Sequence, residues 1–467
     1  MNKTQKILII GLLFLAFVFI FAGYYIQKKI LAPPNVVFIL IDTVRADCIN
    51  PELNPNPITP FLSNLTKKSI YIPNAITPCS WTKPTLATFL TGLPPEKHGV
   101  RYSVMKEDPN APTSDILSDA ILTLPEYLAQ HGYETYAVQT NANLAPLLGF
   151  AQGFKKSHFY FDNGGIASTV TTKSLEFMRN PRQPFFLYAH YMDPHMPYTP
   201  PDSFLQYFKT TANITDEEKS RLEPDPFFEY ATNLIYYLIG KREEPPPFEL
   251  STSAQNEIKR RYHAEIRFTD AEIEKLVQFI SHKFPNTIFF IISDHGEEFW
   301  EHKGVGHGTT VYEEQIRVPV IIYGKGILPK RVDKNISTAG LAKTIVSLIG
   351  LPIPPQFEGY DLIKQNDDVI SKIVTWGPWS DMDLNLEAVV DYPWKLILDK
   401  NKNTVKLFNI SNDPNENLDI SADYPNTVQK LMSYISNEEQ EKYYNTGNTT
   451  SLPPDMIQKL KALGYLD

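Results

Sequence analysis

The stretch Val36–Asp42 reads VVFILID, and the stretch Ile288–Gly296 reads IFFIISDHG. Each is a short continuous apolar run that ends in an acidic residue. Such runs predict strands that are buried on both faces, as in a parallel sheet covered by helices. Three further short apolar runs also predict buried strands. They are Thr135–Val138, Phe185–Ala189 and Val318–Tyr323.

Helical stretches separate these runs, for example at Ile121–His131 and Ala264–Lys283. Strands that alternate with helices favour a parallel or mixed sheet with helices on both faces. We therefore expect an α/β fold with a central, mostly parallel sheet. In such sheets ligands bind at the carboxyl ends of the strands.

Composition narrows the class of protein. The chain has 467 residues, a net charge of −9 and 42% hydrophobic residues, which is a globular balance. The acidic surplus argues against a nucleic acid as the main partner. The two cysteines, Cys48 and Cys79, exclude a disulfide scaffold but leave room for one bridge.

The N-terminus contains an uncharged segment, Ile7–Ile26, that is long enough to span a bilayer as a helix. A cleaved signal peptide is the main alternative, although its apolar core would normally be shorter. A buried helix of a soluble protein is a further alternative. Lysines flank both ends, so the positive-inside rule does not fix the orientation. The simplest topology has one membrane span and an extracytoplasmic body, which would be periplasmic, extracellular or lumenal.

The rest of the chain divides into three parts. Residues 1–33 form the predicted anchor, 34–370 the catalytic domain and 371–467 a smaller C-terminal subdomain. Within the catalytic domain, residues from about 200 to 249 are polar and proline-rich, and we interpret them as an insertion with a helix at Phe227–Ile239. The C-terminal subdomain is expected to contain antiparallel strands and a final helix, at Leu386–Val390, Trp394–Leu398, Thr404–Phe408 and Met456–Leu463.

Acids and histidines follow three of the predicted strands. Asp42 follows the first, Asp294 and His295 follow Ile288–Ile292, and His195 comes soon after Phe185–Ala189. Carboxylates together with an imidazole suit a divalent cation. A single such Asp is more often a helix cap or a turn former. Three strand ends that carry such groups favour a metal site.

Thr82 precedes Pro84 at the start of a predicted helix. A hydroxyl at a helix N-terminus lies where backbone N–H groups and the helix dipole can bind an anion. Next to a metal it can lose its proton and become a nucleophile. An ordinary threonine N-cap is the alternative interpretation.

The chain from Asn35 to the C-terminus resembles the sulfatase family of the alkaline phosphatase superfamily. Each matching segment is short, and their order and spacing carry the resemblance. The segments are Asn35–Asp47, Thr82–Thr85, Leu90–Gly92, Glu96–Val100, Ser293–Glu297, Gly306–Gly308, Tyr312–Pro319, Leu407–Asn409, Asp413–Glu416 and Leu463–Tyr465.

The chain also departs from the family pattern. Thr82 stands where a typical sulfatase has a Cys or Ser that is converted to formylglycine, and Thr cannot undergo the usual conversion. Thr43 replaces a second acid, and Leu86 stands in place of an Arg. The Lys and His usual after the next strand are absent, and Gln139, Asn141 and Asn143 lie there. Thr nucleophiles occur in related phosphodiesterases and in phosphoethanolamine or glycerol-phosphate transferases.

The resemblance implies a role for particular residues. It implies one divalent ion, either Ca, Mg, Mn or Zn, with the ligands Asp42, Thr82, Asp294 and His295. Thr82 would also be the nucleophile. His195 and His307 would contact the sulfuryl or phosphoryl oxygens and protonate the leaving group, and His302 is a second candidate for substrate binding. We interpret His190, His263 and His282 as packing or surface residues, and Lys83 and Arg317 as structural or solvated.

Three functions remain open from the sequence. The first is a membrane-anchored, metal-dependent hydrolase of sulfuric or phosphoric esters, with a sulfated or phosphorylated glycan, lipid or small ester as substrate. The second is a phosphoryl-group transferase that acts on a surface glycan or lipid. The third is a degenerate, non-catalytic binding protein. The complete set of predicted ligands and nucleophile argues against the third.

Overall fold

The computed structural model describes residues 32–462 except 54–56, 106–111, 163, 210–212, 366 and 437–447. Within these residues no helix is long and apolar enough to cross a membrane. The predicted anchor Ile7–Ile26 lies outside the described residues, so it stays a sequence prediction.

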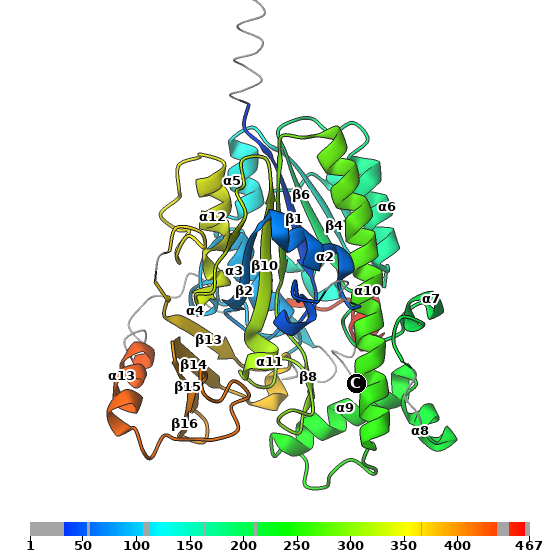
Figure 1. Ribbon diagram of the computed structural model, residues 1–467, viewed down its shortest axis with the longest axis vertical. Helices are drawn as coiled ribbons and strands as arrows, with labels where there is room; N and C mark the ends of the chain where they lie inside the picture. Colours follow the sequence, from blue (N-terminus) through cyan, green and yellow to red (C-terminus); the bar gives the residue numbers. More distant parts are fainter. Residues whose placement is uncertain are drawn as a thin grey trace, which may run out of the picture.

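One mixed sheet forms the centre of the molecule (Figure 1). Its strand order is β11-β2-β10-β7-β1-β6-β4-β5, and β12 pairs with β2. The bounds are β1 Asn35–Ile41, β2 Ile70–Ile76, β4 Glu134–Gln139, β5 Phe159–Phe161, β6 Phe185–Tyr191, β7 Thr287–Ser293, β10 Arg317–Gly324, β11 Lys330–Arg331 and β12 Ile336–Ser337.

The four runs expected to form parallel strands are β1, β4, β6 and β7, and they pair in parallel as β7-β1-β6-β4. The run at Val318–Tyr323 is strand β10, which is antiparallel to both β7 and β2. The expectation of a mostly parallel, mixed sheet flanked by helices is therefore confirmed. Strand β2, which sequence analysis did not identify, contains Pro73 and extends the sheet beyond β10.

Side chains of β1 alternate between the two faces of the sheet. Val36 and Phe38 belong to one apolar cluster, and Val37 and Ile39 belong to the other. All of β1 is buried, because helices cover both faces. Helices α3 (Thr82–Thr91), α5 (Leu124–Gln130) and α12 (Leu341–Leu348) cover the first face, and α2 (Pro60–Leu65), α6 (Ala167–Phe177) and α10 (Thr252–Lys283) cover the second (Figure 1).

The helices differ from expectation mainly in length. Helix α10 begins at Thr252 instead of Ala264, and the Ser251 hydroxyl caps it by accepting a hydrogen bond from the N–H of Ala254 at 3.2 Å. The described residues of the segment interpreted as an irregular insertion form three helices. They are α7 (Asp202–Leu205), α8 (Asp216–Arg221) and α9 (Pro224–Leu238), the last of which is the helix expected at Phe227–Ile239.

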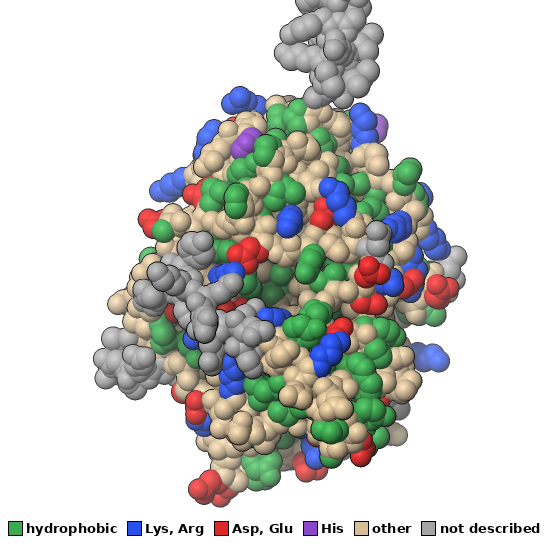
Figure 2. All heavy atoms as spheres, turned by 90° about the vertical axis from the view of Figure 1, so that its left-hand side faces the viewer, with side chains coloured by type: hydrophobic (Ala, Val, Ile, Leu, Met, Phe, Trp, Pro, Cys, Tyr) green, Lys and Arg blue, Asp and Glu red, His purple; other side chains and the backbone are tan. Residues whose placement is uncertain are grey.

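A second, antiparallel sheet follows in the order β13-β14-β15-β16, as expected. Its strands are Ser371–Thr375, Leu386–Asp391, Trp394–Asp399 and Thr404–Asn409, of which β13 was not expected. Lys395 of β15 is fully buried; its ion pair with Glu313 at 3.2 Å joins this sheet to the main body, and a second one, with Glu416 at 2.7 Å, lies within the C-terminal part. Figure 2 views the side of the molecule on which Figure 1 draws this sheet, and shows acidic and basic side chains interspersed over it.

The remaining elements are short or peripheral. They are α4 (Pro95–His98), α11 (Glu313–Ile316), α13 (Pro425–Ser436), α14 (Pro454–Ala462), the pair β3 (Thr113–Asp115) with β17 (Thr449–Ser451), and the pair β8 (Glu298–Phe299) with β9 (Val305–Gly306). Cys48 and Cys79 are buried as thiols and form no disulfide, so the bridge that the sequence left open is absent.

Candidate active site

Adjacent parallel strands bring the predicted metal ligands together. Asp42 directly follows β1, and Asp294 directly follows β7, its neighbour in the sheet. On the other side of β1, His190 of β6 lies in register with Leu40. Because these strands run in the same direction, their carboxyl ends meet at one edge of the sheet.

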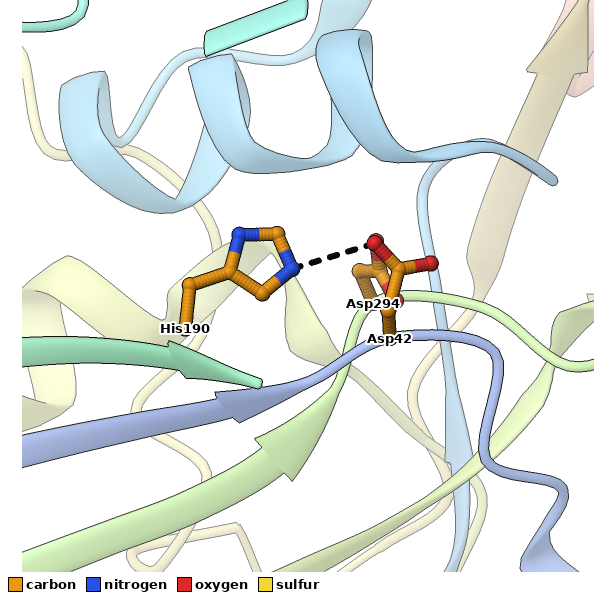
Figure 3. A group of neighbouring side chains, drawn as sticks. All are labelled: Asp42, His190 and Asp294. Carbon is orange, nitrogen blue, oxygen red and sulfur yellow. Dashed lines mark hydrogen bonds and ion pairs between the residues drawn. The ribbon is translucent and has the colours of Figure 1, made fainter. Parts of the chain in front are cut away.

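Asp42, His190 and Asp294 form a fully buried cluster (Figure 3). Their potential ligand atoms all lie within 4.8 Å of one another. His190 Nε2 lies 3.0 Å from Oδ2 of Asp42, and Nδ1 of the same ring lies 3.1 Å from the Tyr188 hydroxyl. His190 thus fixes the carboxylate of Asp42 from the side of β6, so its interpretation as a packing or surface residue was wrong.

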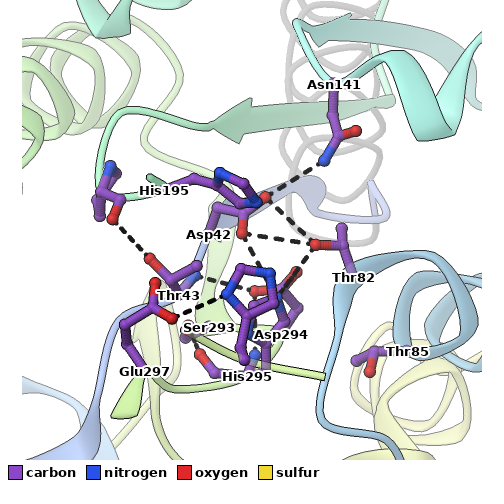
Figure 4. A network of polar contacts seen from close by, with 12 residues as sticks. Asp42, Thr43, Thr82, Thr85, Asn141, His195, Ser293, Asp294, His295 and Glu297 are labelled. Atoms are coloured by element: carbon purple, nitrogen blue, oxygen red, sulfur yellow. Dashed lines mark hydrogen bonds and ion pairs between the residues drawn. The ribbon is translucent and has the colours of Figure 1, made fainter. Parts of the chain in front are cut away.

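Thr82 enters this cluster from the start of helix α3 (Figure 4). Trp81 is the N-cap and Thr82 the first helical residue, so Thr82 lies one position past the cap. Its Oγ1 lies 3.1 Å from Nε2 of His295 and 3.5 Å from both carboxylate oxygens of Asp42. The hydroxyl therefore projects from a helix N-terminus into the group of predicted ligands, where the helix dipole favours negative charge.

The contacts of His295 fix its tautomer. Its Nδ1 lies 2.9 Å from the carbonyl of Gly296 and donates a hydrogen bond to it. That leaves the lone pair of Nε2 directed at Thr82, where it can accept the hydroxyl hydrogen or bind a cation. Ser293 supports this turn, because its hydroxyl donates to the His295 carbonyl at 2.8 Å.

The carboxyl groups of Asp42 and Asp294 differ in the direction in which their pKa values are shifted. Burial disfavours the charged form of Asp42, but the hydrogen bond from His190 and the nearby imidazoles hold its pKa below the ordinary value. Burial raises the pKa of Asp294 to about 7, and the charge of Asp42 adds to the rise. Oδ2 of Asp294 is buried and accepts no hydrogen bond from the described residues.

This arrangement fits a divalent cation. In the described part of the chain neither carboxylate forms an ion pair with a lysine or arginine. Two buried carboxyl groups without such a partner are costly to ionise. A cation held by Asp42, Asp294 and His295 would offset that cost and would occupy the unpaired oxygen of Asp294.

Thr43 and Asn141 occupy positions at which the chain departs from the family pattern. Thr43 has a φ of 57°, and its N–H donates to Oδ1 of Asp294 at 3.3 Å, while its hydroxyl donates to the Pro194 carbonyl at 2.8 Å. Asn141 donates from Nδ2 to Oδ2 of Asp42 at 3.4 Å. Both side chains are uncharged and add no further ligand charge; the backbone N–H of Thr43 supports Asp294, and the Asn141 side chain supports Asp42.

His307 and His195 line the site beside His295. The ring centroids of His307 and His295 are 4.3 Å apart, and those of His307 and His195 are 4.8 Å apart. Nδ1 of His307 lies 2.9 Å from Oε1 of Glu297, and Nδ1 of His195 lies 2.5 Å from the Met196 carbonyl. Both rings are thus held through Nδ1, so each can use Nε2 for proton transfer.

The other sequence candidates lie outside this network. His302 donates from Nδ1 to Glu314 at 2.7 Å and stacks on Tyr312 with ring centroids 3.6 Å apart. Its role in substrate binding stays a prediction. Lys83 is fully buried and donates to the Tyr102 carbonyl at 2.9 Å, and Arg317 pairs with Glu313, so both are structural as expected.

Sequence reasoning missed three residues of the site. Glu297 and Asn141 were part of quoted segments, but nothing in one sequence showed that they would face His307 and Asp42. His190 could have been found, because Phe186 and Tyr188 share its face of β6 and the alternation of the strand extends to residue 190.

Comparison with known proteins places this site in a family. A family model described as Sulfatase matches residues 34–351. An arylsulfatase of Clostridium perfringens is 24% identical over 487 residues, which cover 89% of this chain and 96% of the relative.

Solved structures share the fold. A protein solved in complex with its substrate D-glucosamine-2-N,6-O-disulfate has a TM-score of 0.68 at 17% identity, and the match covers 87% of this chain and 98% of that protein's chain. The phosphonate monoester hydrolase of Agrobacterium radiobacter has a TM-score of 0.64 at 17% identity and covers 90% of this chain and 100% of its own. The family match spans more than half of the chain, so the chain belongs to the sulfatase family and is a sulfuric ester hydrolase.

Proposed function

We propose that the chain cleaves its ester through a covalent intermediate on Thr82, with one divalent ion held by Asp42, Asp294, His295 and Thr82 itself. The observation that carries the proposal is the position of the Thr82 hydroxyl. It lies at the N-terminus of α3 and within 3.5 Å of Asp42 and His295. A buried hydroxyl with several acceptors and a helix dipole behind it meets the requirements of an activated nucleophile.

In the first step Oγ1 of Thr82 bonds to the sulfur or phosphorus, and the bond to the leaving oxygen breaks in line. The Thr82 proton has acceptors at hand in the two carboxylate oxygens of Asp42, both 3.5 Å from Oγ1, because Nε2 of His295 would be occupied by the ion. His307 or His195 protonates the departing alkoxide. Burial lowers the pKa of His307 to about 4, and the hydrogen bond from Nδ1 to Glu297 opposes that shift by favouring the protonated ring. Water then hydrolyses the ester on Thr82 and regenerates the hydroxyl.

A divalent ion, when bound, would stabilise negative charge on Oγ1 and on the oxygens of the transferring group. The backbone N–H groups at the start of α3 face the same place and contribute in the same direction.

Phosphoric or phosphonic esters are a second class of substrate. Two observations favour them. An unmodified Thr occupies the nucleophile position, and the fold is shared with a phosphonate monoester hydrolase. The same intermediate would give a phosphoryl-group transferase if an alcohol replaced water in the second step. A non-catalytic binding protein would not require the Thr82 hydroxyl.

We also propose a surface glycan, a lipid or a small ester as substrate, with the body outside the cytoplasm. The structural neighbour bound to a sulfated glucosamine supports a sulfated sugar. The apolar segment Ile7–Ile26 supports a membrane attachment. Fractionation of the full chain and of a chain that starts at Pro34 tests this attachment, since only the full chain should sediment with membranes.

The test of the proposed function compares aryl sulfate, aryl phosphate, aryl phosphodiester and aryl phosphonate as substrates for the purified full-length chain. Thr82→Ala removes the nucleophile. Thr85→Ala is the matched control, because Thr85 lies in the same helix but donates its hydroxyl to the Cys79 carbonyl at 3.0 Å. We expect turnover of at least one ester that Thr82→Ala loses and Thr85→Ala keeps. Metal binding without turnover of any ester would favour the binding protein.

A further inference from the structure

A cavity of about 400 Å³ adjoins the site on the face of the sheet that α6 and α10 cover. Its walls come from the segment after β6, the segment that leads into α6, and the middle of α10. The residues that matter for its chemistry are Ile166, Asp193, His195, Met196, Glu265 and Phe268.

His195 connects this cavity to the proposed reaction centre. The residue lines the cavity, and its ring lies edge-on to the His307 ring at a centroid distance of 4.8 Å. His307 in turn lies against His295, whose Nε2 is 3.1 Å from the Thr82 hydroxyl. A group that leaves from the Thr82 side and takes a proton from His195 would therefore be next to this cavity.

Two carboxyl groups give the cavity its polarity. Glu265 of α10 is 4% exposed and accepts a hydrogen bond on Oε1 from the N–H of Thr199 at 2.8 Å. Asp193 has a buried Oδ2 with no hydrogen-bond partner. Over the described residues, neither carboxyl group forms an ion pair with a lysine, arginine or histidine, whereas Glu297 of the active site pairs with His307. The two carboxyl groups of the cavity thus have no lysine or arginine partner among the described residues.

The pKa values of Glu265 and Asp193 are consistent with buried carboxyl groups that form no ion pair. Burial raises the pKa of Glu265 to about 9, and the charge of Asp193 adds to the rise. Burial likewise raises the pKa of Asp193 to about 6, although a backbone hydrogen bond from Ala167 opposes it. At neutral pH Glu265 therefore keeps its proton and Asp193 carries the negative charge, so a ligand that donates hydrogen bonds or carries positive charge would relieve Asp193, whereas an anionic ligand would be repelled by it.

Ile166, Met196 and Phe268 supply apolar surface in the same cavity. Apolar walls with a few placed polar groups are typical of small-ligand sites, and they suit the C–H faces of a sugar ring. Phe268 lies one turn along α10 from Glu265, so the two side chains present a ring-stacking surface and an acceptor on the same side of the helix.

We infer that this cavity receives the alcohol part of the ester. It selects an alcohol that presents hydroxyl or ammonium groups as hydrogen-bond donors, and it rejects an alcohol that carries a carboxylate or a second sulfate. The inference rests on the proposed function, because His195 and the reaction at Thr82 assign the cavity to the leaving alcohol. The inference specifies the class of alcohol in the substrate, which the reaction at Thr82 does not determine.

Binding of the free alcohol tests the inference without any chemical step. The probes are the methyl glycosides of glucose, glucosamine and glucuronic acid, which share one ring and differ in one group. Their dissociation constants are measured by nuclear magnetic resonance titration on the full-length chain. The variants are Glu265→Gln, Asp193→Asn and the double substitution, with Glu274→Gln on the same helix as control.

We expect the glucuronide to bind at least about tenfold more weakly than the glucoside to the wild-type chain. The double substitution should narrow that gap to about threefold or less, and Glu274→Gln should leave it unchanged. Tighter binding of the glucosaminide than of the glucoside identifies the ammonium as the preferred donor, and equal binding identifies the hydroxyls.

Three results would overturn the inference. The glucuronide could bind as tightly as the glucoside, the double substitution could weaken all three ligands by one common factor, or none of the three could bind. No ester is cleaved in this binding experiment. Its result therefore does not depend on whether the chain shows Thr82-dependent turnover. The two failures are therefore distinguishable.

Discussion

The Oγ1 atom of Thr82 lies 3.1 Å from Nε2 of His295, although the two residues are 213 positions apart in the chain. The contact joins the start of helix α3 to the end of strand β7, and it brings a hydroxyl into a cluster of two buried carboxyl groups. Because Nδ1 of His295 is bound to the Gly296 carbonyl, the Nε2 lone pair faces the hydroxyl. The reaction proposed for this site depends on that geometry.

His307 should matter most for esters with a poor leaving group. If His307 protonates the departing alkoxide, His307→Gln should lower kcat/KM for an alkyl ester by about 100-fold or more. A nitrophenyl ester needs little protonation and should lose much less. Steady-state kinetics with the two esters measure the difference, and His195→Gln in parallel shows which histidine is the acid. Equal losses on both esters would exclude His307 from this role.

His190 should control the affinity of the site for its metal. The residue fixes Oδ2 of Asp42 at 3.0 Å, and loss of such a contact typically costs 10–100-fold in metal affinity. We expect His190→Gln to weaken binding of the preferred divalent ion by about tenfold or more. Titration against a chelating dye with Mg, Ca, Mn and Zn identifies that ion in the same experiment. An unchanged dissociation constant would show that His190 does not support the ligand set.

Glu265 should make the protein less stable as the pH rises. Its pKa is about 9 in the folded state and 4.5 as the ordinary value, so between these values the folded state keeps a proton that the unfolded state has lost. The free energy of unfolding therefore decreases as the pH rises from about 4.5 to about 9. Glu265→Gln should reduce the slope, measured by urea unfolding at several pH values. A slope equal to that of wild type would contradict the burial of an uncompensated carboxyl group.

Lys395 should be essential for stability although it is far from the nucleophile in sequence. The ammonium group is buried between Glu313 and Glu416, and Lys395→Met would leave Glu416 without a cation and Glu313 with Arg317 alone. We expect a loss of about 3–5 kcal/mol in the free energy of unfolding. The double variant Lys395→Met with Glu416→Gln should recover part of this loss. A single variant as stable as wild type would show that the C-terminal sheet does not depend on this ion pair.

The sequence predicted the central strands well because burial on both faces leaves an unbroken apolar run. It also placed Asp42, Asp294 and His295 correctly at the carboxyl ends of β1 and β7, since strand direction alone brings these residues to one edge. Helix α10 was predicted too short, because its first turns carry polar residues and its start is set by the Ser251 cap. Strand β2 was missed because Pro73 interrupts its pattern.

Contacts between distant segments could not be read from one sequence. His190 was assigned to packing or surface because histidine is intermediate in burial, and nothing in one sequence showed that it faces Asp42. Asp193 and Glu265 lie on different elements, and only the packing of α10 against the end of β6 brings them into one cavity. Glu297 and His307 likewise meet only because of the turn that contains β8 and β9.

The most direct test of the account is to trap the covalent ester. The full-length chain is mixed with an aryl ester that it turns over, quenched in acid within the first turnover, digested and analysed by peptide mass spectrometry. The account predicts a sulfuryl or phosphoryl group on Thr82, absent from Thr82→Ala and present in Thr85→Ala. Turnover at full rate in Thr82→Ala, or a modification on any other residue, would contradict it.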